Sequence, residues 1–409
     1  MKLMSTTAVA IALALGAVSV GVIAPQPAVA QKKGAPSYKL SDDVRKALAG
    51  AQEAMKKNDV AGAEAQVNAA KAAIKTEDDR FLTYNQLYEI AKAKQDLKLQ
   101  AQSIDEMLQS GRVPAEAQPN FYLALGQLSY NTQDFAKAEA ALDQAIKLNA
   151  GDQAAFALLA ETKARNRKPA EAVALIQQAA EEGAAKGQPI PQDWIARGIA
   201  IGVEAKLPDA TTGLTMHWLR NYPTQSHWRD SLLIYRDLRQ LDADQTLDVM
   251  RLQRAAKALR GERDFVELAE ATYLRFPNEA KTAIDEGVAA GVLDLGKSRS
   301  AKELHTLASG KVAQDKASLT KNVSNQRAAI LTADAYASYA DYASAIELYR
   351  KALSMGGGDA NLINTRLGAA LALSGQKEEA KKVLQSITGP RAELAKYWMI
   401  FIDNPPTAG

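Results

Sequence analysis

The sequence predicts an all-α protein, a solenoid of stacked helix hairpins, and three observations support this. A phrase of Asp, an apolar or aromatic residue, two variable residues and usually a small one returns five times. Its first three copies begin 37 and 38 residues apart, and the last two begin 77 apart, about two such steps. From residue 41 onward apolar residues recur at helical spacing, and strand-like alternation is nearly absent. A period of this size is typical of stacked units that cover each other's apolar faces. The phrases begin at Asp59, Asp96, Asp134, Asp264 and Asp341.

Residues 1–30 have the pattern of an export signal. One charge, Lys2, precedes an apolar run over 8–24, and two prolines and an Ala-Val-Ala triplet follow. This predicts cleavage before Gln31, a periplasmic location and a flexible lead-in over 31–40. The alternatives are a secreted chain or an uncleaved membrane anchor, since the run approaches the ~20 residues of a spanning helix. No later stretch is apolar enough to span a bilayer, so we expect a soluble mature chain.

Composition narrows the classes of function. The 409 residues contain no cysteine, which excludes disulfides, thiolate metal sites and a lipid-bearing cysteine. Fifty Lys and Arg against 47 Asp and Glu give a formal charge of +3, with both signs interleaved. This is typical of solvated helices, and we expect no nucleic-acid partner.

Residues 41–190 are predicted to form a first array of repeats. Two units between 120 and 180 align at a spacing of 34 residues. The recurrent Asp is expected at the entry to each second helix, where its carboxylate accepts bonds from free N–H groups. In one unit Lys168-Pro169 takes that place, and Pro suits a first helical position. The aligned pairs are Tyr122 with Phe156, Leu125 with Leu159, Gly126 with Ala160, Ala138 with Ala172, Leu142 with Ile176, and Ala145 with Ala179.

The rest of the chain is predicted to continue the array less regularly. Residues 191–325 read as divergent repeats, with a helix near 226–240 that has no obvious partner and with short helices over 294–325. Residues 326–409 contain a second matched pair of units and a final apolar helix near 390–402. That helix is interpreted as a cap on the last hairpin. The alternative is a partly exposed docking patch.

The aligned units resemble the tetratricopeptide repeat, which has an aromatic residue and a Leu-Gly pair on its first helix and small residues on its second. The resemblance implies a right-handed superhelix whose first helices line an inner, ligand-binding face. Carried onto the matching positions, it implies a groove that binds a protein or an extended peptide. The implied groove residues are Asn85, Glu89, Asn120, Leu123, Gln127, Tyr130, Asn131, Glu161 and Arg165.

The sequence offers little catalytic chemistry. Its three histidines, His217, His227 and His305, lack metal-ligand spacing, and no Gly-x-Ser-x-Gly elbow is present. A wall-cleaving transglycosylase would need a further catalytic domain, and only about twenty residues follow the last repeat. We therefore expect no catalytic, metal or cofactor residues.

These expectations favour a non-enzymatic scaffold of the bacterial cell envelope that binds a protein. The alternative is recognition of envelope polysaccharide or peptidoglycan, with Trp194, Trp218 and Trp228 stacking on sugar rings.

Overall fold

The computed structural model describes residues 37–149 and 153–408, and this part of the chain is helical apart from one isolated β-bridge. The expected all-α architecture is confirmed. Its contacts divide into two compact units, the first ending at Ile176 and the second running from Gln177 to Gly409. These units do not follow the three expected ranges, because 191–325 and 326–409 fall within one unit. The predicted signal, 1–30, lies outside the described residues.

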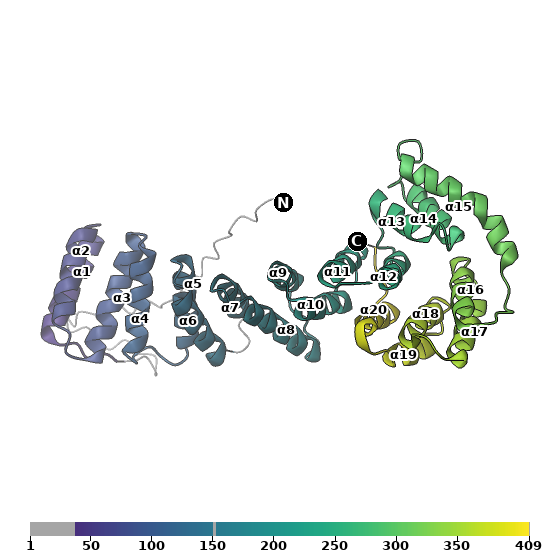
Figure 1. Ribbon diagram of the computed structural model, residues 1–409. Helices are drawn as coiled ribbons and strands as arrows, with labels where there is room; N and C mark the ends of the chain where they lie inside the picture. The colour runs from purple at the N-terminus through teal and green to yellow at the C-terminus, as the bar shows by residue number, and fades with distance from the viewer. Residues whose placement is uncertain (1–36, 150–152, 409) are drawn as a thin grey trace. The chain divides into compact units, whose positions relative to one another are not determined.

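Unit 1 is a row of antiparallel helix pairs in which each of the first six helices packs on the next along the chain (Figure 1). One continuous apolar cluster runs from Val44 in the first helix to Ala141. The helices are α1 (Asp42–Lys56), α2 (Val60–Ala72), α3 (Glu77–Ala93), α4 (Leu97–Gln109), α5 (Gln118–Asn131), α6 (Phe135–Leu148), α7 (Gln153–Arg165) and α8 (Pro169–Ala185), the last of which continues into unit 2.

The predicted Asp caps are confirmed at four of the five phrases. Each carboxylate accepts a hydrogen bond from the backbone N–H three residues later, as Asp59 does from Gly62 at 2.8 Å, so it satisfies a donor that the helix leaves free. Asp96, Asp134 and Asp341 do the same. Asp264 differs, because it is the third residue of its helix and accepts instead from the N–H groups of Arg260 and Gly261.

The turn before each second helix has one backbone geometry. The residue before the cap is left-handed, and the cap N–H donates to the carbonyl five residues earlier, as Asp59 does to Ala54 at 2.9 Å. Outside glycine this conformation costs energy, yet seven such turns use another residue with φ between 52° and 63°. These are Asn58, Gln95, Gln133, Arg167, Lys206, Lys257 and Ala340, and Gly375 fills the same place in the last hairpin. Lys257 differs in one respect, because it lies four residues before the cap of the following helix, Gly261.

Small residues allow the two helices of a hairpin to approach closely. A Cβ added at Gly126 of α5 would lie 2.5 Å from Cγ of Leu142 in α6. At the matching place in the last hairpin, a Cβ on Gly368 would lie 2.6 Å from Leu384. Of the aligned alanines on the second helices, Ala138, Ala145 and Ala172 are buried, and Ala179 is half-buried. Most of the aligned positions thus occupy equivalent places in the packing.

The lead-in is attached where the structure describes it. Residues 37–40, expected to be flexible, pack on α3. Tyr38 stacks on Phe81 with ring centroids 5.0 Å apart, and the Lys39 N–H donates to Asp78 at 2.7 Å. Next to them, Asp79 is fully buried and accepts from the Ser41 N–H at 2.8 Å.

Unit 2 begins in the same manner and then departs from a simple row. The expected short helices over 294–325 are wrong, because α15 is a single helix of 20 residues. The helix near 226–240 has partners, since α11 packs between α10 and α12. The helices are α9 (Gln192–Glu204), α10 (Pro208–Asn221), α11 (Gln225–Leu238), α12 (Ala243–Ala255), α13 (Glu262–Thr272), α14 (Pro277–Ala289), α15 (Arg299–Ser318), α16 (Gln326–Ser338), α17 (Tyr342–Met355), α18 (Ala360–Leu373), α19 (Lys377–Gln385), a 3₁₀ turn (Gly389–Arg391) and α20 (Ala392–Asp403).

The C-terminal end of unit 2 returns to its beginning (Figure 1). Helix α20 packs on α18 and α19 and also on α10. The Tyr397 hydroxyl lies 2.6 Å from that of Thr215, and Phe401 meets Trp228 edge to face at 6.0 Å. Beyond α20, the Thr407 N–H donates to the Pro223 carbonyl at 2.7 Å. The final helix is therefore a cap, as expected, and it also closes unit 2 onto helices some 180 residues earlier.

Candidate functional site

The groove residues implied by the sequence lie on the first helices of successive hairpins, α3, α5 and α7. Three of them converge. The Arg165 Nε donates to Glu161 at 3.0 Å, and the Tyr130 hydroxyl donates to the same carboxylate at 3.4 Å. The Tyr130 ring also meets Phe135 edge to face, with centroids 5.7 Å apart. Two neighbouring hairpins thus contribute an aromatic ring and a charged pair to one place.

The electrostatics of this cluster keep both donors protonated. Burial, together with the Glu161 charge, raises the pKa of the Tyr130 hydroxyl. The hydrogen bond to Glu161 raises the pKa of the Arg165 guanidinium. We refer to Tyr130, Glu161 and Arg165 as the groove cluster.

The other implied residues are dispersed. The expected place of Leu123 in the groove is corrected by the structure. Its side chain is only 6 % exposed and packs in the core with Leu142 and Leu159. It contacts the following hairpin, so it cannot meet a partner while the hairpins stay packed. Asn120 and Asn131 are exposed, whereas Asn85, Glu89 and Gln127 are half-buried, and Glu89 pairs with Lys92 at 3.1 Å.

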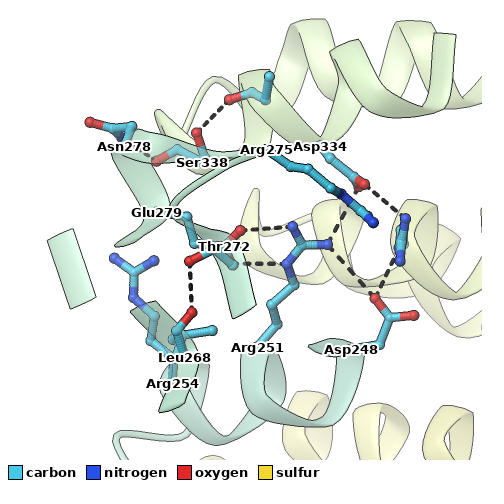
Figure 2. Close-up of polar contacts among 12 residues, drawn as sticks. Asp248, Arg251, Arg254, Leu268, Thr272, Arg275, Asn278, Glu279, Asp334 and Ser338 are labelled. Atoms are coloured by element: carbon cyan, nitrogen blue, oxygen red, sulfur yellow. Dashed lines mark hydrogen bonds and ion pairs between the residues drawn. The ribbon is translucent and has the colours of Figure 1, made fainter. Parts of the chain in front are cut away.

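Unit 2 contains a cleft that the sequence did not predict. Its volume is about 270 Å³, and side chains of α12, α14, α16, α17, α18 and α20 line it. One wall is built from small residues, among them Ala337 and Ala369, and the floor is built from charged side chains. Figure 2 shows part of this floor, in which Arg251 of α12 lies between Glu279, Asp248 and Asp334.

The charges of the floor pair with one another across distant helices. Arg251 donates to Glu279 through Nε and Nη2, at 2.9 and 2.7 Å. Arg366 of α18, which is 5 % exposed, donates to Asp248 at 2.9 Å and to Asp334 at 2.8 Å. We refer to Asp248, Arg251, Glu279, Asp334, Arg366 and Arg391 as the charged floor, because Arg391 pairs with Asp248 from the other side.

Mutual pairing keeps Glu279 and Arg366 ionised despite their burial. Burial acts to raise the pKa of the Glu279 carboxyl, but Arg251 outweighs it, and the net pKa is lowered. Burial also acts to lower the pKa of Arg366, yet Asp248 and Asp334 raise it well above its usual value. The Tyr349 hydroxyl, which donates to Asp334, has its pKa raised by burial and by that carboxylate.

The rim of the cleft is more open. Arg254 of α12 donates to Glu286 of α14 through Nε and Nη2, at 2.9 and 2.7 Å. Its Nη2 also donates to Thr282 at 3.0 Å. Tyr342, the first residue of α17, lies on the same rim.

Reactive groups are not assembled in this cleft. No histidine is among its lining residues, and its two aliphatic hydroxyls, Ser338 and Thr365, donate to backbone carbonyls of their own helices. Throughout the described ranges, no group of three or more His, Asp or Glu side chains could hold a metal ion. The cleft can bind a polar group, but it presents no nucleophile beside a base.

The histidines and tryptophans have structural surroundings. His227 stacks on Trp218 with centroids 4.0 Å apart, and its Nδ1 lies 2.7 Å from the Tyr222 carbonyl. His305 lies 2.8 Å from Asp285. Trp228 is fully buried and so cannot stack on a sugar ring.

Helix pairs that repeat one turn, one Asp cap and one close Gly–Leu approach make up an α-solenoid of helix hairpins. This fold resembles the tetratricopeptide repeat.

The chain is similar to several solved structures at low sequence identity. No protein-family model and no curated protein matches the sequence. Among solved structures, a tetratricopeptide repeat protein from Parabacteroides merdae is 14% identical, with 62% of this chain and 99% of that chain covered and a TM-score of 0.27. The TPR2AB domain–pHSP90 complex of yeast Sti1 is 15% identical, with 70% and 99% covered and a TM-score of 0.25. The Cut9–Hcn1 hetero-tetramer of APC/C is 14% identical, with 78% and 66% covered and a TM-score of 0.26.

Sequence reasoning missed the cleft because each of its charges reads as a solvated helical residue. One signal was available. Asp334 lies between Ala333 and Ala335 on α16, whose other buried residues are alanines. Arg366 lies directly before Leu367-Gly368, on the packed face of α18. Charges at such apolar positions indicate buried pairs.

Proposed function

We propose that this repeat protein is a non-enzymatic scaffold of the bacterial cell envelope that binds a protein or an extended peptide. The observation that supports it best is the groove cluster, where two adjacent hairpins present an aromatic ring, a guanidinium and a carboxylate together. Such a surface suits side-chain hydrogen bonds and an aromatic anchor to an extended segment.

The proposed location rests on the sequence of residues 1–30. Export followed by cleavage before Gln31 would place the repeats in the periplasm, and secretion or retention of the anchor are the alternatives. Among residues 37–149 and 153–408, no helix combines the length and apolar character that a membrane span requires.

Binding is favoured over catalysis because the charged side chains in the cleft of unit 2 form ion pairs with one another. Polysaccharide recognition is less well supported, since Trp228 lies in the core and Trp218 is covered on one face by His227.

The experiment is a pulldown from envelope extract with protein isolated from the periplasmic fraction, whose N-terminus is checked by mass. We expect a chain beginning at Gln31 that recovers a defined protein. The double variant Tyr130→Ala, Arg165→Ala should lose that protein, because it removes the ring and the cation while its hairpins stay packed.

The matched control is Gln144→Ala, Lys147→Ala, which changes two exposed residues of the second helix α6. Equal recovery by wild type, control and groove variant would exclude the groove cluster. Recovery of the uncleaved chain with membranes would instead support an anchored protein.

A further inference from the structure

The cleft of unit 2 has the features of a ligand site that is separate from the groove cluster. Its volume arises because the residues on one wall are small. Ala337 lies at the end of α16, Ala340 in the following turn, and Ala369 and Ala370 on α18. Larger side chains there would fill the space, as leucines do elsewhere in the repeats.

The charges of this floor are already paired. Three carboxylates, Asp248, Glu279 and Asp334, face three guanidinium groups, Arg251, Arg366 and Arg391. Arg366 also donates to Asp244 at 3.0 Å. Arg391 pairs with Asp248 without lining the cleft, so the lining itself has four carboxylates, counting Glu286 of the rim, against three guanidinium groups. Breaking a buried pair to admit a charged ligand would leave its partner uncompensated, which is costly. The charged floor therefore fixes the shape of the site, and recognition is left to the rim.

The rim holds unused hydrogen-bond donors. The bonds of Arg254 to Glu286 and Thr282 occupy its Nε and Nη2. Within the described part of the chain, its Nη1 and the Tyr342 hydroxyl have no hydrogen-bond partner, although both residues line the cleft. Both groups can donate to an anion that enters beside the alanine wall.

The charge of the ligand follows from the hydrogen-bonding groups of the rim that have no partner among the described residues. Glu286 is the rim carboxylate, and Arg254 already holds both of its oxygens. A cation would have to compete with Arg254 for it, whereas an anion can use the free Nη1 edge without displacing Glu286. A guanidinium with its planar fork can serve two carboxylates at once.

We propose that this cleft binds a carboxylate carried on a short chain, with Arg254 and Tyr342 donating to it and the alanine wall receiving the carbons. The carboxylate can come from a small free acid or from an acidic side chain of a peptide. This site shares no residue with the groove cluster. The proposal can therefore be tested independently of the function proposed above.

The test is calorimetry on the full chain with four probes: glutarate, an end-blocked Ala-Glu-Ala peptide, its Ala-Gln-Ala analogue and an Ala-Lys-Ala peptide. We expect at least one carboxylate probe to bind and the Gln and Lys probes not to bind. Binding of glutarate and the Glu peptide alike indicates that the carboxylate alone is recognised. Binding of only one of them identifies the source.

Four variants make the assignment specific. Arg254→Gln should weaken the carboxylate probe by about tenfold or more, as the loss of a charge-assisted bond predicts, and Tyr342→Phe should weaken it less. Glu286→Gln should strengthen it, because the competing carboxylate is removed. Ala369→Leu should abolish binding by filling the cleft, and retained melting temperature and circular dichroism show that the variant is folded.

Binding of the Lys peptide that is lost in Glu286→Gln would overturn the proposal, because the site would then select cations. No binding by either carboxylate probe would also overturn it. So would carboxylate binding that Arg254→Gln and Ala369→Leu leave unchanged, because the ligand would then lie elsewhere.

Discussion

At the scale of single residues, the fold depends on small side chains where helices approach. Gly126 shows this, because its missing Cβ leaves room for the Leu142 side chain of the partner helix. In α15, by contrast, a Cβ on Gly310 would meet nothing within 4 Å. The same substitution should therefore have opposite effects at the two glycines.

Gly126→Ala is expected to destabilise the protein by about 1–3 kcal/mol, because the added methyl overpacks the hairpin. Gly310→Ala, the matched control, is expected to stabilise it by roughly 0.5–1 kcal/mol through helix propensity and unfolded-state entropy. Urea denaturation of both variants measures this. A stabilised Gly126→Ala would show that α5 and α6 do not approach as described.

At the scale of elements, half-buried charges join one hairpin to the next. Glu139 of α6 accepts from Lys163 of α7 at 2.8 Å, from Asn166 at 2.9 Å and from Lys168 at 3.0 Å, so one carboxylate ties together the turn that precedes α8. Burial acts to raise the pKa of Glu139, but these partners lower it from 4.5 to about 2.

This shift makes a pH prediction for unit 1. Because the folded pKa lies below the unfolded one, the stabilisation is present above the unfolded value and is lost as the pH falls through the folded value. The difference in unfolding free energy between wild type and Glu139→Gln should therefore shrink between about pH 5 and pH 2. Denaturation at several pH values measures it, and a difference that does not change with pH would contradict the pairing.

At the scale of the whole molecule, unit 2 is closed by its own C-terminal end. Helix α20 contacts the hairpin before it and also α10 and Trp228. The closure combines polar contacts, such as that of Arg239 with Glu393 at 2.6 Å, with aromatic packing in which Tyr397 and Trp398 are almost fully buried. A solenoid that ended in an ordinary cap would contact only its last hairpin.

Removal of residues 390–409 is expected to speed amide hydrogen exchange in α10 and α11. The deletion exposes Trp228 and Tyr235 to solvent and removes Arg391, the ion-pair partner of Asp248. Lys396→Ala, on the exposed side of α20, is the control and should change nothing. If exchange rose only in α18 and α19, α20 would be a cap without a closing role.

The local features of the repeat could be predicted from the sequence. The Asp caps, the close approach at Gly126 and the buried Ala138 each depend on contacts within about one repeat length, so they leave a periodic trace. The left-handed turns left no such trace, because residues such as Gln133 and Ala340 occupy positions where glycine would have marked them. Leu123 was misplaced because an apolar residue on an inner helix can face either a ligand or the next hairpin.

The sequence by itself determined the helical class, the hairpin unit and its period, since these follow from interactions between neighbours along the chain. Only the tertiary structure decided the cleft and the closure. Arg366 pairs with Asp248, which is 118 residues away in the sequence, and Thr215 hydrogen-bonds Tyr397, which is 182 residues away. Pairs that far apart carry no periodic signal, and each of their charges, taken alone, is indistinguishable from a solvated residue on a helix.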